Sequence, residues 1–222
     1  MKYYKIQAGL INKVVGAMAS HKMVDGYNYG SKNSIYNLNI RGKLNFVPDI
    51  DAIQILKRAK MMDIIVSVPI GSSNLIISDK LTKIILNHTI PIETQIFDAY
   101  ALYEGEKYHY NFLYIFDAKE NDIVDWQQST FVETSVGGTI IGEPIKYSFE
   151  DFTTKKVKEG KYFNPNLLVL KLEKINTDVF RLDHTYRGYY VSEVLKDAIE
   201  ETGCEGVDLI PIDQLGFEVE FV

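Results

Sequence analysis

A repeated strand–serine–helix pattern is the feature that most constrains how this chain can fold. It occurs in "LIISDKLTKIILNH" at residues 75–88 and in "YYVSEVLKDAIEETG" at residues 189–203. In each stretch an apolar run ends at a serine, which is followed by an acid and then by Leu and Ile at helical spacing. A serine oxygen at this position accepts an otherwise free backbone N–H, and the acid interacts favourably with the helix dipole. We therefore interpret Ser78 and Ser192 as helix N-caps rather than nucleophiles, with Gly203 ending the second helix.

Alternating apolar residues predict strands over much of the remaining chain. Residues 90–102 and 107–118 are expected to form a β-hairpin around the glycine turn of "YEGEK", with the aromatic residues from Tyr108 to Phe116 on one face. "TSVGGTIIGEP" suggests another turn with a short strand. Further strands are expected at 2–6, 63–70, 166–175, 178–182, 188–191 and 215–222.

A helix is also expected in "VPDIDAIQILKRAKMM" at residues 47–62. Apolar residues recur there at every third position, and Asp49 follows a proline as a plausible N-cap. Together these patterns predict an α+β fold, a mostly antiparallel sheet with a few flanking helices. The 222 residues suffice for one compact domain spanning 1–222, and a boundary between two lobes is expected near 88–91.

Cysteine content and hydropathy point to the cytoplasm. Cys204 is the only cysteine, so the chain has no internal disulfide, as is usual in a reducing compartment. The polar, aromatic start "KYYKIQ" favours a first strand over a signal peptide. Because no apolar run approaches the roughly 20 residues of a membrane helix, no membrane partner is expected.

The charge distribution favours a protein partner over nucleic acid. Residues 193–222 contain nine acids and one lysine, a net charge of −8, whereas the first 192 residues carry +2. Within them, residues 153–174 carry +4. Nucleic-acid binding needs a net basic face, so this distribution argues against it. An acidic C-terminal part suits a basic partner protein, and a solvated tail that aids solubility is the alternative.

The motifs associated with catalysis, metals and cofactors are missing from the sequence. "PIGSSNL" lacks the second glycine of a nucleophile elbow, and the four histidines lack metal-ligand spacing. No phosphate-binding loop is found, and "DAKENDIVDW" lacks the glycine and final glutamate of a calcium loop. His184 and Cys204 form a weak candidate for a catalytic pair, whereas Arg181 and Asp183 are expected to pair on one face of a strand. We expect no catalytic, metal or cofactor site, and therefore not an enzyme.

The candidates for partner contact lie in two acidic regions. Trp126 is more often a core residue, but in an acidic loop it is also a candidate anchor. The candidate partner-binding residues are Asp122, Asp125, Trp126, Glu200, Glu201 and Glu205.

Three stretches resemble a known family: "GSSNLIISDKLTKII", "DIVDWQQSTF" and "TDVFRLDHTYRGYYVSEVLKDAIEETGCEGVDLIPI". The chain resembles bacterial immunity proteins of polymorphic toxin systems, in particular the immunity-protein-eleven family. The resemblance covers about residues 45–213 and is most specific over 178–211. Where the family usually has an aromatic after the last glycine, this chain has "GVDLIPI". The matching positions, expected to be structural, are Ser78, Leu81, Asp125, Ser129, Asp178, Phe180, Arg181, Ser192, Leu195, Gly203, Gly206 and Pro211.

The resemblance implies a non-catalytic protein that binds and neutralises a cognate toxin, usually encoded nearby. It identifies neither the toxin nor the contact face. Two alternatives remain open. One is a small hydrolase with a site between the two lobes, for which a deep pocket joining Arg181, His184 and Cys204 is the expected sign. The other is a non-catalytic adaptor.

Overall fold

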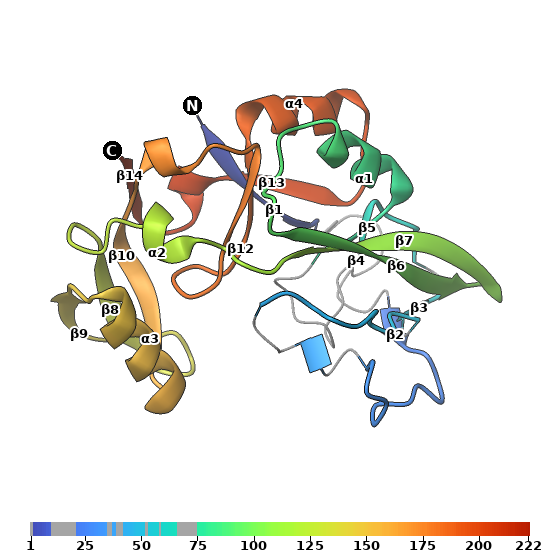
Figure 1. Cartoon of the computed structure of the whole chain (residues 1–222), viewed down its shortest axis with the longest axis horizontal. Coiled ribbons are helices and arrows are strands. Elements are labelled where there is room, and N and C mark those ends of the chain that lie inside the picture. Colours follow the sequence, from blue (N-terminus) through green and yellow to red (C-terminus); the bar gives the residue numbers. More distant parts are fainter. Residues whose placement is uncertain are drawn as a thin grey trace.

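The computed structural model describes residues 2–9, 21–34, 37–38, 42–51, 53–57, 59–65 and 75–222. Within these ranges the chain has the predicted α+β fold, with three mostly antiparallel sheets and flanking helices (Figure 1). Sheet A has the order β11 (Val179–Leu182), β12 (Gly188–Ser192), β1 (Tyr3–Ala8) and β13 (Val207–Pro211). Sheet B has the order β2 (His21–Met23), β3 (Ile53–Ile55), β6 (Thr94–Tyr103), β7 (Glu106–Ile115), β5 (Leu75–Ile77) and β4 (Ile64–Ile65).

Sheet C completes the strands of the described ranges. Its order is β14 (Glu218–Phe221), β10 (Tyr162–Leu170), β8 (Thr130–Thr134) and β9 (Ile140–Ile145). The helices are α1 (Asp79–Leu86), α2 (Glu120–Ile123), α3 (Phe149–Lys158) and α4 (Glu193–Glu201), with short 3-10 turns at Leu172–Lys174 and Ile212–Gln214. No helix of this described part has the length and apolar character needed to cross a membrane.

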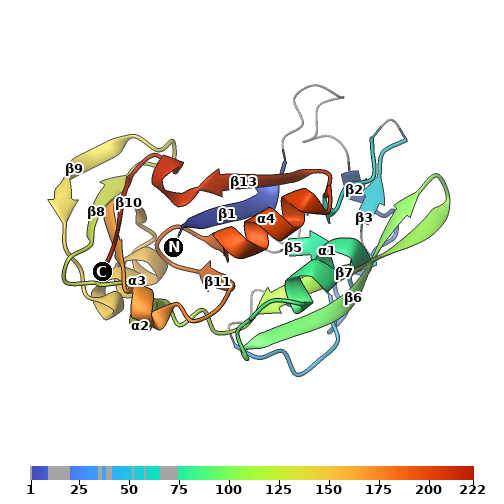
Figure 2. The ribbon, with the colours of Figure 1, turned by 90° about the horizontal axis from the view of Figure 1, so that it is seen from above.

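Helices α1 and α4 lie side by side and cover sheets A and B from the same side (Figure 1 and Figure 2). Their buried faces carry Leu81 and Ile85 from α1, and Leu195 and Ile199 from α4. These side chains share one apolar core with residues of both sheets, including Leu113 of β7. The two helices therefore join the two sheets into one packed body.

The predicted aromatic hairpin is confirmed as β6 and β7, which pair along their whole length. Tyr110, Phe112 and Tyr114 lie in a second core on the other face of sheet B, whereas Leu113 lies in the core beneath α1 and α4. Apolar residues on both faces explain why β7 is buried continuously from residue 110 to 115. A third core lies between sheet A and sheet C and includes aromatic residues of α3.

The helix predicted at residues 47–62 is wrong. Ile53–Ile55 form β3, which pairs with β2 and, in parallel, with β6. The predicted cap, Asp49, instead donates its backbone N–H to the carbonyl of Asn33. Ile53 and Ile55 are both buried, so the apolar residues here follow the two-residue period of a strand. The same residues also fit a helical spacing, and pairing with a distant strand decided in favour of the strand.

Helix α3 was not predicted, although its start carries a clear local signal. Ser148 caps the helix by accepting the N–H of Asp151, and Gly160 follows its end with a φ of +66°. The other predicted strands are present as β1, β4, β10, β11, β12 and β14, and the predicted turn at 134–144 joins β8 and β9. The strand expected at 166–175 ends at Leu170, because the chain then forms the 3-10 turn Leu172–Lys174. The part of the expected strand 63–70 that begins at residue 66 lies outside the described residues.

The chain contains the same structural unit twice. In the first unit the strands have the order β4, β5, β7, β6, and α1 connects β5 to β6. In the second unit the order is β11, β12, β1, β13, and α4 connects β12 to β13. The N-terminal strand β1 thus occupies in the second unit the position that β7 occupies in the first.

The position expected for a lobe boundary, residues 88–91, lies in the connection between α1 and β6. β5, before that connection, pairs with β7, after it. Sheet B therefore continues across this position.

Candidate functional site

Ser78, the first of the two serines, has a capping role and also binds an aspartate. Its Oγ accepts the N–H of Leu81 at 3.2 Å and donates to Oδ1 of Asp63 at 2.5 Å. The other oxygen of Asp63 accepts the N–H of Glu205 at 2.7 Å, and the N–H of Asp63 donates to the carbonyl of Glu205 at 2.8 Å. Since Glu205 follows α4, the cap of α1 is linked to the end of the other helix.

Ser192 makes the reciprocal set of contacts. Its Oγ accepts the N–H of Leu195 at 3.3 Å and donates to Oδ1 of Asp178 at 2.6 Å. Oδ2 of Asp178 accepts the N–H of Thr89 at 3.0 Å, and the N–H of Asp178 donates to the carbonyl of Thr89 at 2.7 Å. Thr89 follows α1, so each helix end binds the aspartate of the other unit. We call these two reciprocal sets the crossed caps; they confirm that Ser78 and Ser192 are helix N-caps.

The remaining positions of the family resemblance also have structural surroundings. Leu81 and Leu195 are fully buried in the core between the sheets, and Phe180 is buried on the other face of sheet A. The buried Oγ of Ser129 accepts the N–H of Val169 at 3.0 Å. Gly203 and Gly206 have φ of +67° and +71°, and Pro211 pairs with Tyr4 at the end of β13.

Arg181 and Asp183 pair on one face, as the sequence predicted. The Arg181 guanidinium lies 2.5 Å from a carboxylate oxygen of Asp183 and donates to the carbonyl of Ile115 at 2.8 Å. The guanidinium is also within 5.6 Å of the ring centres of Tyr114 and Tyr189. The side chain of Arg181 is 11% exposed. Its hydrogen bond to the carbonyl of Ile115 holds β11 against the end of β7.

Glu120 is a buried carboxylate that the sequence analysis did not single out. It is 3% exposed and accepts the backbone N–H groups of Asp183, His184 and Thr185, together with the hydroxyl of Thr185. These four donors, at 2.5–2.8 Å, compensate the carboxylate for lost solvation. Glu120 therefore orders the turn between β11 and β12. Its partners follow it by more than sixty residues, so no local pattern could reveal it.

The carboxylates of the C-terminal candidate group lie on the outer face of α4 and just beyond it. Glu200 and Glu201 are exposed on the helix, and Glu205 is exposed after it. Glu200 pairs with Lys196 at 2.7 Å, and Glu205 pairs with Lys60 at 2.7 Å. Among the described residues no ion pair involves Glu201. The buried face of α4 packs into the core, so this acidic face is the part of the helix that a partner can reach.

Of the other candidates, Asp125 and Trp126 are engaged inside the molecule. Trp126 is 8% exposed and packs against Phe131 and Phe152. Trp126 is thus a core residue, which is the more common role of a single tryptophan, and its side chain offers little surface to a partner. Asp125 accepts the side-chain amide of Gln128 at 3.0 Å and two backbone N–H groups. The hydrogen bond from the Gln128 amide and, to a smaller extent, those from the two backbone N–H groups keep the pKa of Asp125 below its usual value, although partial burial raises it.

The residues proposed for a hydrolase are distributed over different places. Cys204 lies near Asp63 and Lys80, where burial and then the charge of Asp63 raise the pKa of its thiol and disfavour the thiolate. The ring of His184 packs edge-on against Phe149. Within the described residues no group of three or more His, Cys, Asp or Glu side chains is placed to hold a metal ion.

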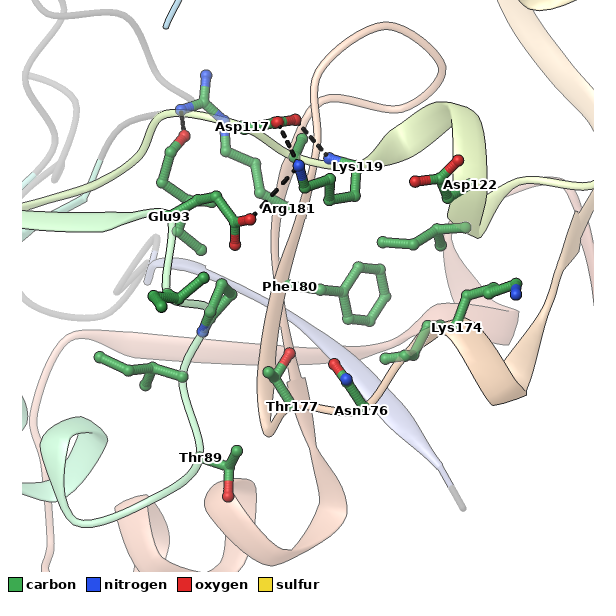
Figure 3. A pocket seen from close by; sticks show the side chains of 17 residues that line it. Thr89, Glu93, Asp117, Lys119, Asp122, Lys174, Asn176, Thr177, Phe180 and Arg181 are labelled. Atoms are coloured by element: carbon green, nitrogen blue, oxygen red, sulfur yellow. Dashed lines mark hydrogen bonds and ion pairs between the residues drawn. The ribbon is translucent and has the colours of Figure 1, made fainter. Parts of the chain in front are cut away.

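A hollow of about 500 Å³ lies between four segments of the chain (Figure 3). It is formed by residues 89–93 after α1, residues 115–119 after β7, α2, and residues 174–181 around the start of β11. Arg181 contributes to its wall, whereas His184 and Cys204 do not line it. Asp122, one of the partner candidates, lies at its rim.

Comparison with known proteins adds no family assignment. No protein-family model matches the chain, and no curated protein matches it.

Proposed function

We propose that this chain is an immunity protein, which binds and neutralises a cognate toxin without catalysis. The resemblance of residues 178–211 to the immunity-protein-eleven family suggests this class. The observation that carries the proposal is the outer face of α4, where exposed carboxylates gather on a helix that both sheets hold in place. A rigid acidic face is suited to a basic surface on a toxin.

The proposed mechanism is steric and electrostatic. Complementary charge accelerates the encounter between two proteins and selects the correct partner, while the contact itself covers the toxin's active surface. Because α4 is fixed by the crossed caps at both ends and by apolar packing along its length, little ordering is needed on binding.

Co-expression tests the function directly. The reading frame adjacent to the gene is induced in a laboratory bacterium with and without this chain, and growth is followed. We expect toxicity that only this chain relieves, together with a one-to-one complex on purification. A harmless neighbour, or toxicity that the chain does not relieve, contradicts the proposal. An adaptor is distinguished from an immunity protein because its partner is not toxic when expressed alone.

Charge reversal tests the docking face. We expect Glu200→Lys, Glu201→Lys and Glu205→Lys, introduced together, to slow association with the toxin by about tenfold or more and to flatten its dependence on salt. Stopped-flow or surface-plasmon kinetics at several ionic strengths measures both. The matched control reverses three other exposed carboxylates in the region of sheet C, Glu143 on β9, Glu150 on α3 and Glu159 directly after α3. Unchanged association rates in the first variant would reject α4 as the docking face.

A further inference from the structure

The hollow beside β11 has the size and the apolar floor of a small-molecule site. Its volume of about 500 Å³ lies within the roughly 300–1,000 Å³ of typical ligand pockets. The side chains of Ile123, from α2, and of Ile175 and Phe180, from residues 174–181, line it, and each is at most 7% exposed. In Figure 3 the Phe180 ring lies at the centre of the lining residues. An apolar group placed over this ring would leave water for a preformed apolar surface.

Most charges around the hollow already neutralise one another. Lys119 lies 2.6 Å from a carboxylate oxygen of Asp117 and 3.4 Å from one of Glu93. The guanidinium of Arg181 is paired with Asp183. These groups close the side of the hollow towards β7, and each of them already has an oppositely charged partner within the protein.

Two opposite charges at the hollow are left over. Asp122, from α2, and Lys174, from the turn before β11, are exposed, and neither makes an ion pair or a side-chain hydrogen bond with any residue that the structure describes. Figure 3 shows both on the same side of the Phe180 ring. A ligand that matches this arrangement carries an ammonium group and a carboxylate at one end and an apolar body at the other.

We propose that the hollow binds a zwitterion of this kind, a free α-amino acid with an apolar side chain. Its ammonium group pairs with Asp122, its carboxylate pairs with Lys174, and its side chain lies on Phe180, Ile123 and Ile175. Both ion pairs are charge-assisted, and the opposite signs at the rim disfavour molecules that carry a single charge. This binding site is independent of the immunity function, since none of its groups lies on the outer face of α4.

Isothermal titration calorimetry of the full chain tests the proposal. The probes are L-leucine and L-phenylalanine, with their N-acetyl derivatives, their methyl esters, and a fatty acid and an alkylamine of similar apolar size. We expect both free amino acids to bind, and each blocked or singly charged probe to bind at least about tenfold more weakly, because one charge-assisted contact is lost. No binding of the free amino acids at millimolar concentration overturns the proposal, as does equal binding of the singly charged probes.

Variants assign the two ends of the ligand. We expect Asp122→Asn to weaken L-leucine binding but not the weaker binding of its N-acetyl derivative, and Lys174→Gln to weaken L-leucine but not its methyl ester. Glu218→Gln, an exposed change on β14, is the matched control and should leave all affinities unchanged. Both rim residues are exposed, so the variants should fold, which circular dichroism checks. Binding that neither variant alters overturns the assignment.

Discussion

His109 is an exposed residue of β7 that lies between two carboxylates. Its Nδ1 is 2.8 Å from Asp79 at the start of α1, and its Nε2 is 3.2 Å from Asp98 on β6. Partial burial lowers the pKa of His109, but the hydrogen bonds and charges of Asp98 and Asp79 outweigh it, so the pKa is raised above the ordinary 6.5. Its two partners come from other elements, so no local pattern in the sequence predicts this cluster.

This arrangement predicts a pH dependence of stability. Because the folded-state pKa of His109 is raised, its contribution is fully present below pH 6.5 and is lost as the pH rises through the folded-state value. We expect His109→Gln to reduce the free energy of unfolding at about pH 5.5 and to have little effect at about pH 8.5, on either side of the ordinary histidine pKa. Urea unfolding at both values measures this, and an equal loss at both would show that the imidazolium contributes nothing.

At the scale of elements, α1, α3 and α4 each begin with a capping serine, but the serines differ in what else they bind. Ser78 and Ser192 also donate to Asp63 and Asp178, which hold the opposite helix ends. Ser148 on α3 donates to Asp151 of its own first turn. The first two caps therefore connect elements far apart in the chain, whereas the third is local.

The difference predicts unequal costs for one substitution. Removing a cap costs typically about 1 kcal/mol, which we expect for Ser148→Ala. For Ser192→Ala we expect about 2–3 kcal/mol, because the partly buried carboxylate of Asp178 loses its donor as well. Denaturant unfolding of both variants measures the difference, and equal losses would contradict a joining role for Ser192.

For the whole molecule, the crossed caps and the shared core between sheets A and B join the two repeated units. Neither unit keeps all its contacts when the other unfolds, since Thr89 binds Asp178 and Glu205 binds Asp63. Trp126 lies in the separate core between sheets A and C, so its fluorescence reports a distant part of the molecule.

We therefore predict one cooperative unfolding transition. Trp126 fluorescence and far-ultraviolet circular dichroism should give coincident urea curves, and Asp178→Ala should move both midpoints down together. The control is Glu150→Ala, a change at an exposed position. It should change the free energy of unfolding measured by either probe by no more than about 0.5 kcal/mol. Separate transitions for the two probes would show that the core around Trp126 unfolds separately from the rest of the molecule.

The sequence by itself determined the elements whose signals are local. A serine followed by an acid and an apolar helical face predicts α1 and α4, and alternation around a glycine turn predicts the β6–β7 hairpin, because caps, turns and side-chain periodicity act within a few residues. The pairing of Arg181 with Asp183 followed from the same alternation.

Tertiary structure decided what depends on distant partners. Ile53 and Ile55 became a strand because β2 and β6 supply its hydrogen bonds, against a spacing that suggested a helix. The crossed caps and the hollow bring together residues from segments far apart in the chain, so no short pattern could predict them. The periodicity of apolar residues predicts which side chains share one face of a helix or strand. Only the packing of the folded chain determines which faces of different elements contact each other.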